Sequence, residues 1–312
     1  MHLDRPVVIA WLKHFGTCLI SKPTRPVLRV ATRGSALARW QAAYIAGLLQ
    51  HVVYVEPLVV ATEGDRQVET PISAIGGKGV FVKEVQAAVL DGRADLAVHS
   101  AKDLPAVTPE GLVLAAVPRR GDPRDVLVGC RLVNLPEGAL VATGSARRRV
   151  QLRELRCDLR FAELRGNIGT RLAKAVDFDA VVMAKAALDR LGERPPVVEV
   201  LSCETMIPQV GQGALAVECR VDNKRVRSLL AGIQDLITRR EVDAERAFLT
   251  TLDGDCALPV GAYARIQGDT VVMRAVLSAS LDGRCHFLVG EDNDGEALGH
   301  RLARQLLDRV VR

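Results

Sequence analysis

The sequence is poor in aromatic residues and has no long apolar run, and each absence excludes a class of protein. Phe, Trp and Tyr make up only 4% of the 312 residues, whereas proteins that bind single-stranded nucleic acid stack bases on aromatic rings. No recognised nucleic-acid motif is present either, so we expect no nucleic-acid partner. No apolar stretch approaches the about 20 residues that a membrane-spanning helix needs. We therefore expect no membrane partner.

The start of the chain also lacks the features of a signal peptide. The apolar stretch from Pro6 to Leu12 ends at Lys13, and no small-residue cleavage site follows it. Prolines are frequent in this segment, and proline interrupts regular structure. We expect residues 1–26 to form an extension outside the fold.

The seven cysteines lack the CxxC or Cys/His spacing of a metal site. An odd number without such patterns is typical of reduced thiols, so we expect a cytoplasmic protein without a bound metal. Most of the cysteines fall in predicted strands, helix ends or the amino-terminal extension, where they act as small apolar side chains. Cys256 differs, because it lies in a loop rich in Gly and Asp, where we expect an exposed thiol.

What the sequence does contain is a concentration of arginines in its middle third. The net charge is only +5, but eight arginines crowd between positions 147 and 171. The planar guanidinium suits carboxylates and phosphates equally well. Since nucleic-acid signals are missing, a small polyanion is the better candidate ligand. The arginines are Arg147, Arg148, Arg149, Arg153, Arg156, Arg160, Arg165 and Arg171.

Strands alternate with helices along most of the chain, which predicts an α/β fold with mostly parallel sheets. Val27 to Ala31 predicts a strand that leads into a helix beginning at Ser35, and Val141 to Ala146 repeats this pattern. The repeat suggests two similar α/β domains, followed by a smaller α+β domain. We expect the first domain to comprise residues 27–120 and 212–233, the second 121–211, and the third 234–312.

The best candidate for chemistry is the segment from His99 to Pro105, which follows a short apolar strand, Asp95 to Val98. Strands of open α/β sheets deliver polar side chains to a ligand crevice at their carboxyl ends. Asp103 is therefore our first candidate for a catalytic group. The alternative is that Asp103 only orders the turn before Pro105 and that His99 is a structural residue.

Two other junctions offer anion sites. At Arg33, Gly34 and Ser35 a helix N-terminus stands beside an arginine, which favours a bound anion. The Gly-rich loop from Ile75 to Gly79, with Lys78, could approach a phosphate. It lacks the spacing of a nucleotide-binding P-loop, so a nucleotide enzyme is a weaker hypothesis.

Several short motifs follow one another in a characteristic order from about Val27 to the carboxyl terminus. They are Ala31-Thr32-Arg33-Gly34-Ser35, Gly76-Gly77-Lys78-Gly79, His99-Ser100-Ala101-Lys102-Asp103-Leu104-Pro105, Arg147-Arg148, Arg165-Gly166-Asn167, Gly169-Thr170-Arg171, Val210-Gly211-Gln212-Gly213-Ala214 and Gly254-Asp255-Cys256. One such motif would be weak evidence for any family, but this many motifs in the same order are highly specific. Together they resemble the porphobilinogen deaminase (hydroxymethylbilane synthase) family.

The resemblance implies two domains like the lobes of periplasmic binding proteins, and a third that carries an attachment cysteine. It implies a transferase of tetrapyrrole and haem biosynthesis that joins four porphobilinogen molecules head to tail, loses ammonia each time and releases linear hydroxymethylbilane. A dipyrromethane cofactor would be attached covalently to Cys256 as a thioether. We expect porphobilinogen and the growing oligopyrrole chain as partners, and a monomeric protein.

The same resemblance implies roles for individual residues. Asp103 matches the catalytic aspartate, and Arg33, Lys102 and Arg148 match other residues associated with catalysis. A cleft rich in arginine fits this role, since porphobilinogen carries two carboxylates and the growing chain adds more. The resemblance implies cofactor contacts from Ser35, Lys78, Thr143, Ser145, Arg147, Arg148 and Arg171, and substrate contacts from Arg33, Arg165, Arg171 and Arg190.

The strongest alternative is a non-catalytic binding module whose two lobes clamp a small anion. Such a module has no need of a loop cysteine like Cys256, and the sequence shows neither a secretion signal nor a helix-turn-helix motif. Gly144 and Asp255 depart from the residues common in the family, but no charged catalytic position is lost.

Overall fold

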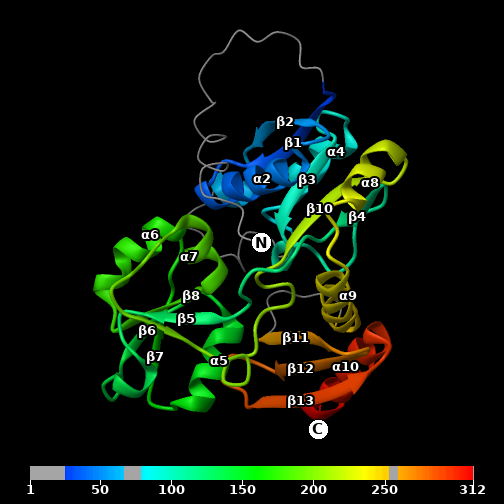
Figure 1. Cartoon of the computed structure of the whole chain (residues 1–312). Helices are drawn as coiled ribbons and strands as arrows, with labels where there is room; N and C mark the ends of the chain where they lie inside the picture. The colour runs from blue at the N-terminus through cyan, green and yellow to red at the C-terminus, as the bar shows by residue number, and fades with distance from the viewer. Residues whose placement is uncertain (1–24, 67–78, 253–258, 312) are drawn as a thin grey trace.

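Among the described residues, two of the three sheets have five strands each, and their parallel strands follow the same spatial order with a reversed strand inserted at the same place. The computed structural model describes residues 25–66, 79–252 and 259–311. The first sheet, at the top of Figure 1, has the order β2 (Tyr54–Val60), β1 (Val27–Arg33), β3 (Leu96–Ser100), β10 (Leu215–Arg220), β4 (Leu112–Ala116). The second sheet, at the lower left, has the order β7 (Arg160–Ala162), β6 (Leu140–Ala142), β8 (Ala180–Ala184), β5 (Asp125–Val128), β9 (Val198–Val200).

One strand is reversed in each of these sheets. In the first sheet β1 is parallel to β2 and β3, and β10 runs antiparallel between β3 and β4. In the second sheet β6 is parallel to β7 and β8, and β5 runs antiparallel between β8 and β9. The other strands of each sheet therefore share one direction. The prediction of two α/β domains with mostly parallel sheets is confirmed.

Helices cover both faces of the first sheet. On one face Ile45 of α2 and Leu230 of α8 pack in the same cluster as Val98. On the other face Val85 of α4 packs with Ala97. Neighbouring residues of a strand point to opposite faces, so burial on both sides explains why β3 is apolar along its length. The elements of this domain are α2 (Ala36–Leu49), α3 (Glu63–Arg66), α4 (Lys83–Leu90), α8 (Lys224–Ala231) and the 3-10 helix η2 (Ala101–Asp103).

The second sheet is covered in the same way. Leu152 of α5 packs with Val182 on one face, and Leu188 of α7 packs with Val181 on the other. Helix α6 lies on the same side as α7, with Leu172 in that cluster. The elements of this domain are α5 (Ala146–Leu155), α6 (Ile168–Ala173), α7 (Lys185–Leu191) and the 3-10 helices η3 (Leu132–Asn134) and η4 (Lys174–Asp177).

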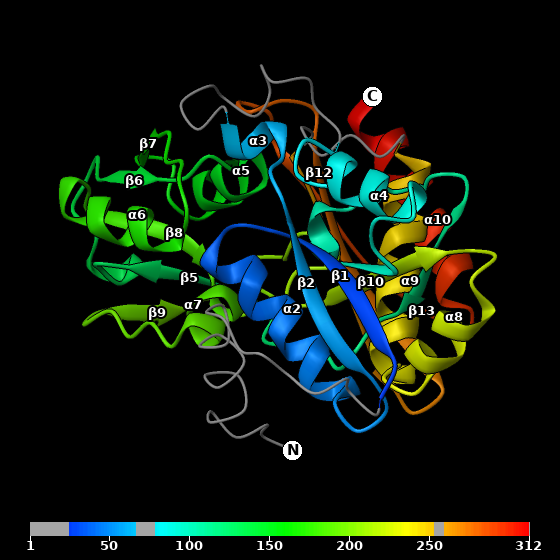
Figure 2. The ribbon, with the colours of Figure 1, turned by 90° about the horizontal axis from the view of Figure 1, so that it is seen from above.

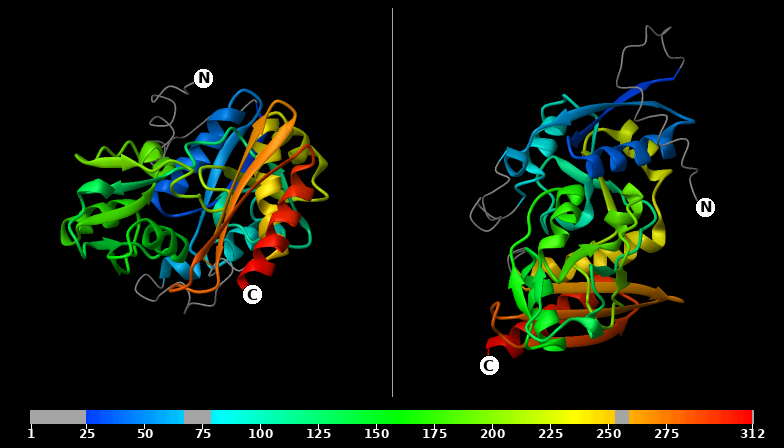
Figure 3. Two further views of the ribbon diagram at one scale, coloured as in Figure 1. Left: turned by 90° about the horizontal axis from the view of Figure 1, so that it is seen from below. Right: turned by 90° about the vertical axis from the view of Figure 1, so that its left-hand side faces the viewer.

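The third sheet is a small antiparallel meander with two helices. Its strands pair in sequence order, and the wholly buried Phe248 belongs to the core between this sheet and the helices. A Cβ on Gly299 would collide with the carbonyl of Ala244, so glycine allows the two helices to approach closely. This smaller α+β domain, whose strands are orange and whose last helix is red in Figure 3, was also predicted. The elements are β11 (Val260–Gln267), β12 (Thr270–Ser278), β13 (Cys285–Asp292), α9 (Leu236–Thr251) and α10 (Gly295–Val311).

Two segments connect the α/β domains, the first crossing (residues 117–124) and the second crossing (residues 201–214). They lie side by side, because the Gly121 N–H donates to the Gly213 carbonyl (2.9 Å). Glu245 of α9 joins both to the third domain, as its carboxylate binds Arg120 (2.7 Å) and accepts from the Gly211 N–H (2.7 Å). The three domains thus meet at these crossings.

The exact division of the chain into domains stays a prediction. No helix among the described residues is long and apolar enough to cross a membrane.

Candidate active site

The turn η2 carries two of the predicted catalytic residues. It follows β3 directly and holds Lys102 and Asp103 at the carboxyl end of the first sheet. The Ala101 N–H donates to the Ala214 carbonyl (3.0 Å). A Cβ on Gly211 would lie 3.0 Å from the Ala101 carbonyl carbon. The second crossing therefore packs on this turn and fixes its position.

A small cavity of about 50 Å³ lies beside the turn. Asp103 lines it together with Arg33, Ser35, His99 and Phe81. Arg33 and Ser35 come from the end of β1 and the start of α2, which neighbour β3 in the sheet. The structure thus brings three of the predicted site residues together at one sheet edge.

Arg33 already has a carboxylate partner in Asp65. Its Nε donates to Oδ2 of Asp65 (3.1 Å), its Nη2 pairs with Oδ1, and its guanidinium lies 4.2 Å from the centre of the Phe81 ring. The two side chains of the pair are 24% and 28% exposed. Burial raises the pKa of Asp65, but hydrogen bonds from Arg33 and Thr62 outweigh this and hold the pKa below its ordinary value.

The two equivalent strand-to-helix junctions hold Ser35 and Ser145. Ser35 caps α2 by accepting a hydrogen bond from the Ala38 N–H (3.3 Å). Ser145 precedes α5 without a capping bond from its side chain, and its N–H donates to Oγ1 of the buried Thr143 (3.2 Å). Thr143 therefore orders the turn that presents Ser145.

Lys102 lies among charges of both signs. Desolvation is the main reason that the pKa of Lys102 falls from 10.5 to about 8. The guanidiniums of Arg147 and Arg148 act in the same direction. The carboxylates of Asp103 and Asp125 oppose it. Groups from the second domain therefore act electrostatically on a turn of the first.

Arg147 and Arg148 converge on one buried carboxylate. Arg148 donates to Oδ1 of Asp125 from Nε (3.0 Å) and Nη2 (2.7 Å), and Nη1 of Arg147 lies 2.8 Å from Oδ2. Arg148 also donates to the Val182 carbonyl, and Arg147 to the Ile207 carbonyl. Burial raises the pKa of Asp125, but the two guanidiniums outweigh this and hold the pKa far below its ordinary value. Internal partners therefore fix both arginines.

Arg165 lies between β7 and α6, and Arg171 lies in the last turn of α6. The Nε of Arg171 donates to the Gly166 carbonyl (2.8 Å). Burial, together with the nearby charges of Arg148 and Arg165, lowers the pKa of Arg171 to about 10. The carboxylate of Asp103 opposes this shift. Asp103 thus lies within electrostatic reach of the second domain.

Arg190, another predicted substrate contact, lies in a different place. Its Nη2 donates to the Gly213 carbonyl (2.6 Å), and its guanidinium lies 5.7 Å from the ring centre of Trp40 on α2. Burial lowers the pKa of Arg190 to about 10. Figure 2 shows α7, which carries Arg190, beside α2. In this structure Arg190 connects the two α/β domains.

Lys78 and Cys256 lie outside the described residues, so their predicted roles stay predictions. His99 is buried, and its Nε2 lies 3.2 Å from Oε2 of the buried Glu218. These surroundings agree with the structural alternative for His99.

Sequence reasoning missed Asp65, Asp125 and Gln212. The two aspartates hold the arginines, and Gln212 contacts Lys102. A signal existed for Asp125, because it begins a strand whose remaining residues are all apolar, and a buried carboxylate needs a cationic partner. No comparable signal marked Asp65.

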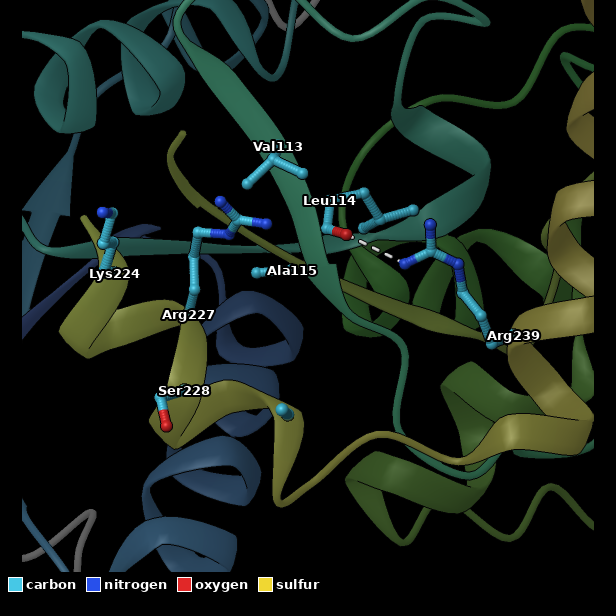
Figure 4. A pocket seen from close by; sticks show the side chains of 8 residues that line it. Val113, Leu114, Ala115, Lys224, Arg227, Ser228 and Arg239 are labelled. Carbon is cyan, nitrogen blue, oxygen red and sulfur yellow. Dashed lines mark hydrogen bonds between the residues drawn. The ribbon is translucent and has the colours of Figure 1, made fainter. Parts of the chain in front are cut away.

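A larger cavity, of about 490 Å³, lies elsewhere, along the edge strand β4 (Figure 4). Lys224, Arg227 and Arg239 line it, and Nη1 of Arg239 donates to the Leu114 carbonyl (2.9 Å). It shares no lining residue with the cavity at Asp103. Convergence of charged groups, rather than cavity size, therefore singles out the candidate site.

Two family models match the chain. The model of the porphobilinogen deaminase dipyrromethane cofactor binding domain matches residues 28–228. The model of the porphobilinogen deaminase C-terminal domain matches residues 239–308. The chain belongs to the porphobilinogen deaminase family. The elements that carry Asp103 and the clustered arginines all fall within the cofactor binding domain of this family.

Solved structures of low identity accompany the porphobilinogen deaminase match. YhfZ from Shigella flexneri is 17% identical, with a TM-score of 0.35 over 74% of this chain and 98% of that one. The regulatory domain of OxyR from Pseudomonas aeruginosa, in its reduced form, is 16% identical, with a TM-score of 0.37 over 67% and 98%. A ligand-binding component of an ABC-type import system from Staphylococcus aureus is 11% identical, with a TM-score of 0.39 over 73% and 79%. The family assignment rests on the two family models alone.

Proposed function

We propose that the chain condenses four porphobilinogen molecules head to tail, losing ammonia at each step, and releases linear hydroxymethylbilane. Membership of the porphobilinogen deaminase family supports a transferase-type enzyme with a dipyrromethane cofactor. The observation that carries the proposal is the position of Asp103, a carboxylate that lines a cavity with Arg33 and lies within electrostatic reach of Lys102 and Arg171. A substrate that carries carboxylates and reacts through a cation needs both signs of charge in one site.

The donor set fits a cofactor whose side chains end in carboxylates. Guanidiniums bind carboxylates with two parallel hydrogen bonds. Nε of Arg147 is buried without a hydrogen-bond partner among the described residues, so a donor is left over for a ligand. When bound, the cofactor supplies the pyrrole carbon to which the first substrate is joined. In the proposal, Cys256 anchors it as a thioether, and its contacts come from Ser35, Lys78, Thr143, Ser145, Arg147, Arg148 and Arg171.

Asp103 acts on the reacting substrate. As the carbon–nitrogen bond of the aminomethyl group breaks, the electron pair leaves with ammonia and positive charge develops on the pyrrole. The carboxylate stabilises this charge, and η2 holds it in place before the reaction begins. Nζ of Lys102, with a pKa of about 8, can exchange a proton near neutral pH, which suits a step that releases an amine.

Arg33, Arg165, Arg171 and Arg190 are the proposed partners of the acetate and propionate groups. Arg33 has to exchange its partner for this, and the partial exposure of the Arg33–Asp65 pair supports such an exchange. A substrate carboxylate in place of Asp65 keeps the guanidinium paired, so that little electrostatic energy is lost. The second domain supplies most of these arginines, and the first supplies Asp103.

Intact mass spectrometry of the purified chain tests the proposal. We expect a mass excess equal to two linked pyrrole units, which Cys256→Ala abolishes. Cys157→Ala is the matched control, since Cys157 is an exposed thiol outside the proposed site and its loss leaves the excess in place. An active protein whose mass equals that of the sequence alone would contradict the proposal of a covalently attached cofactor. A chain that binds porphobilinogen without consuming it supports the binding-module alternative.

A further inference from the structure

Gln212 joins groups that belong to both α/β domains. It is wholly buried on the second crossing, and its backbone carbonyl accepts a hydrogen bond from Nε of Arg120 (2.9 Å). The remaining contacts are made by its side-chain amide. Its Nε2 donates to the Pro123 carbonyl (2.7 Å) and to Oδ1 of Asp125 (3.0 Å). These two acceptors use both protons of the amide nitrogen. Oε1 is therefore left to accept from Nζ of Lys102, 3.5 Å away.

Asp125 continues this chain of contacts into the second domain. Its Oδ1 accepts from Gln212 and from Arg148 (2.7 Å), and its Oδ2 faces Arg147 (2.8 Å). Asp125 and Gln212 are fully buried, and Arg148 is only 6% exposed. Tight packing leaves such groups little freedom, so a displacement of the guanidinium passes through the carboxylate and the amide to Lys102.

A neutral amide suits position 212 better than a charged or an apolar side chain. An amide can donate to a carboxylate on one side and accept from an ammonium on the other. A carboxylate there would repel Asp125 and attract Lys102 more strongly. A methionine would fill the same space and break both contacts.

We propose that Gln212 is a positioning residue that holds Lys102, and with it the turn of Asp103, in register with the Asp125–Arg148 pair of the second domain. The proposal rests on the proposed function, in which these groups act on one substrate. The structural evidence for it is that the buried amide of Gln212 contacts Lys102 in the first domain and Asp125 in the second.

Lys102 offers a direct readout because charges from three elements act on it. Asp103 lies on its own turn, Asp125 begins β5, and Arg147 and Arg148 lie on α5. In Gln212→Glu a third carboxylate joins this set and raises the pKa of Lys102 above about 8. In Gln212→Met the ammonium loses an acceptor, and the pKa falls. Shifts of opposite sign are a signature that a general loss of stability does not produce.

Pulsed acetylation measures these shifts in the full chain. Acetic anhydride modifies only the neutral amine, and peptide mass spectrometry reports the modified fraction of Lys102 at each pH. We expect midpoints in the order Gln212→Glu, wild type, Gln212→Met, from highest to lowest pH. Gln234→Met is the control, because it removes another internal amide, whose partners are the Val117 N–H and the Asp235 carbonyl. Its midpoint is expected to equal that of the wild type.

Turnover of porphobilinogen supplies the second readout. In Gln212→Met we expect kcat to fall about tenfold or more with KM changed less than about threefold, since a misplaced group affects the reacting geometry more than binding. Gln234→Met is expected to keep the wild-type kcat.

The experiments distinguish a failure of the proposed function from a failure of the positioning role of Gln212. If wild-type protein consumes no porphobilinogen, the proposed function fails, while acetylation still decides the role of Gln212. If wild-type protein is active and the Lys102 midpoint is the same in both Gln212 variants, the positioning role is wrong. Should Gln212→Glu not fold, the direction of the shift in Gln212→Met decides alone.

Discussion

The two α/β domains each pair arginine with aspartate at the candidate site, but they bury the pair to different depths. In the first domain Arg33 and Asp65 are 24% and 28% exposed. In the second, the side chain of Arg148 is 8% exposed and that of its partner Asp125 is not exposed at all. Both pairs join a guanidinium to a carboxylate, and burial is the main difference between them.

Burial decides which pair can exchange its partner. Solvent around Arg33 and Asp65 screens their attraction, and water can replace either partner at small cost. Asp125 has no access to water and is held by Arg147, Arg148 and Gln212. We infer that the Arg33–Asp65 pair can release its arginine to the substrate, whereas the buried carboxylate of Asp125 holds Arg147 and Arg148 in a fixed arrangement.

Removal of Asp125 is expected to have the largest effect. In Asp125→Ala the guanidiniums of Arg147 and Arg148 lose their buried counter-charge, which lowers the free energy of unfolding by about 3–5 kcal/mol. Urea unfolding of the full chain measures this loss. Asp65→Ala serves as the matched variant and is expected to lose at most about 1 kcal/mol. Equal losses in the two variants would contradict the comparison.

Replacement of Arg33 by lysine is expected to have an intermediate effect, seen in activity rather than stability. Lysine keeps the charge but cannot form two parallel hydrogen bonds with a carboxylate. We expect KM for porphobilinogen to rise about tenfold, as for the loss of about 1.4 kcal/mol of binding, with the fold unchanged. Arg93→Lys is the control, since Arg93 pairs with Asp91 on an exposed surface. Unchanged kinetics in Arg33→Lys would remove Arg33 from the substrate site.

The smallest expected effect concerns pH. The pKa of Asp65 in the folded chain lies below its ordinary value of 3.8, so its pairing stabilises the fold above that value. The contribution is lost as the pH falls through the folded pKa. The difference in stability between wild type and Asp65→Asn, at most about 1 kcal/mol at pH 7, is therefore expected to shrink in acid. Urea unfolding at pH 7 and pH 3 checks this. A stability difference that is larger at pH 3 than at pH 7 would contradict a lowered pKa for Asp65.

The sequence predicts the local parts of the site well. The apolar run before His99 and the polar residues after it predict a strand that delivers Asp103 to a sheet edge, and the structure has β3 followed by η2. The repeated strand-to-helix pattern at Ser35 and Ser145 predicts two related domains, and the parallel strands of the two sheets follow the same spatial order. Both predictions depend on residues that are neighbours in the chain.

The missed residues depend on contacts between distant segments. Gln212 meets Asp125 across 87 positions and Lys102 across 110. Arg33 meets Asp65 across 32 positions, and no periodicity links them. A local pattern cannot show which loops come together, so the arginines were predicted as ligand contacts without their internal carboxylate partners.

The turnover of porphobilinogen by Asp103→Asn tests the central claim most directly. The amide has the shape of the carboxylate but lacks its charge, so the fold and the mass excess at Cys256 are expected to stay as in the wild type. We expect kcat to fall at least about a hundredfold, because the developing cation loses its counter-charge. A folded Asp103→Asn protein that consumes porphobilinogen at the wild-type rate would contradict the claim that this carboxylate carries the reaction.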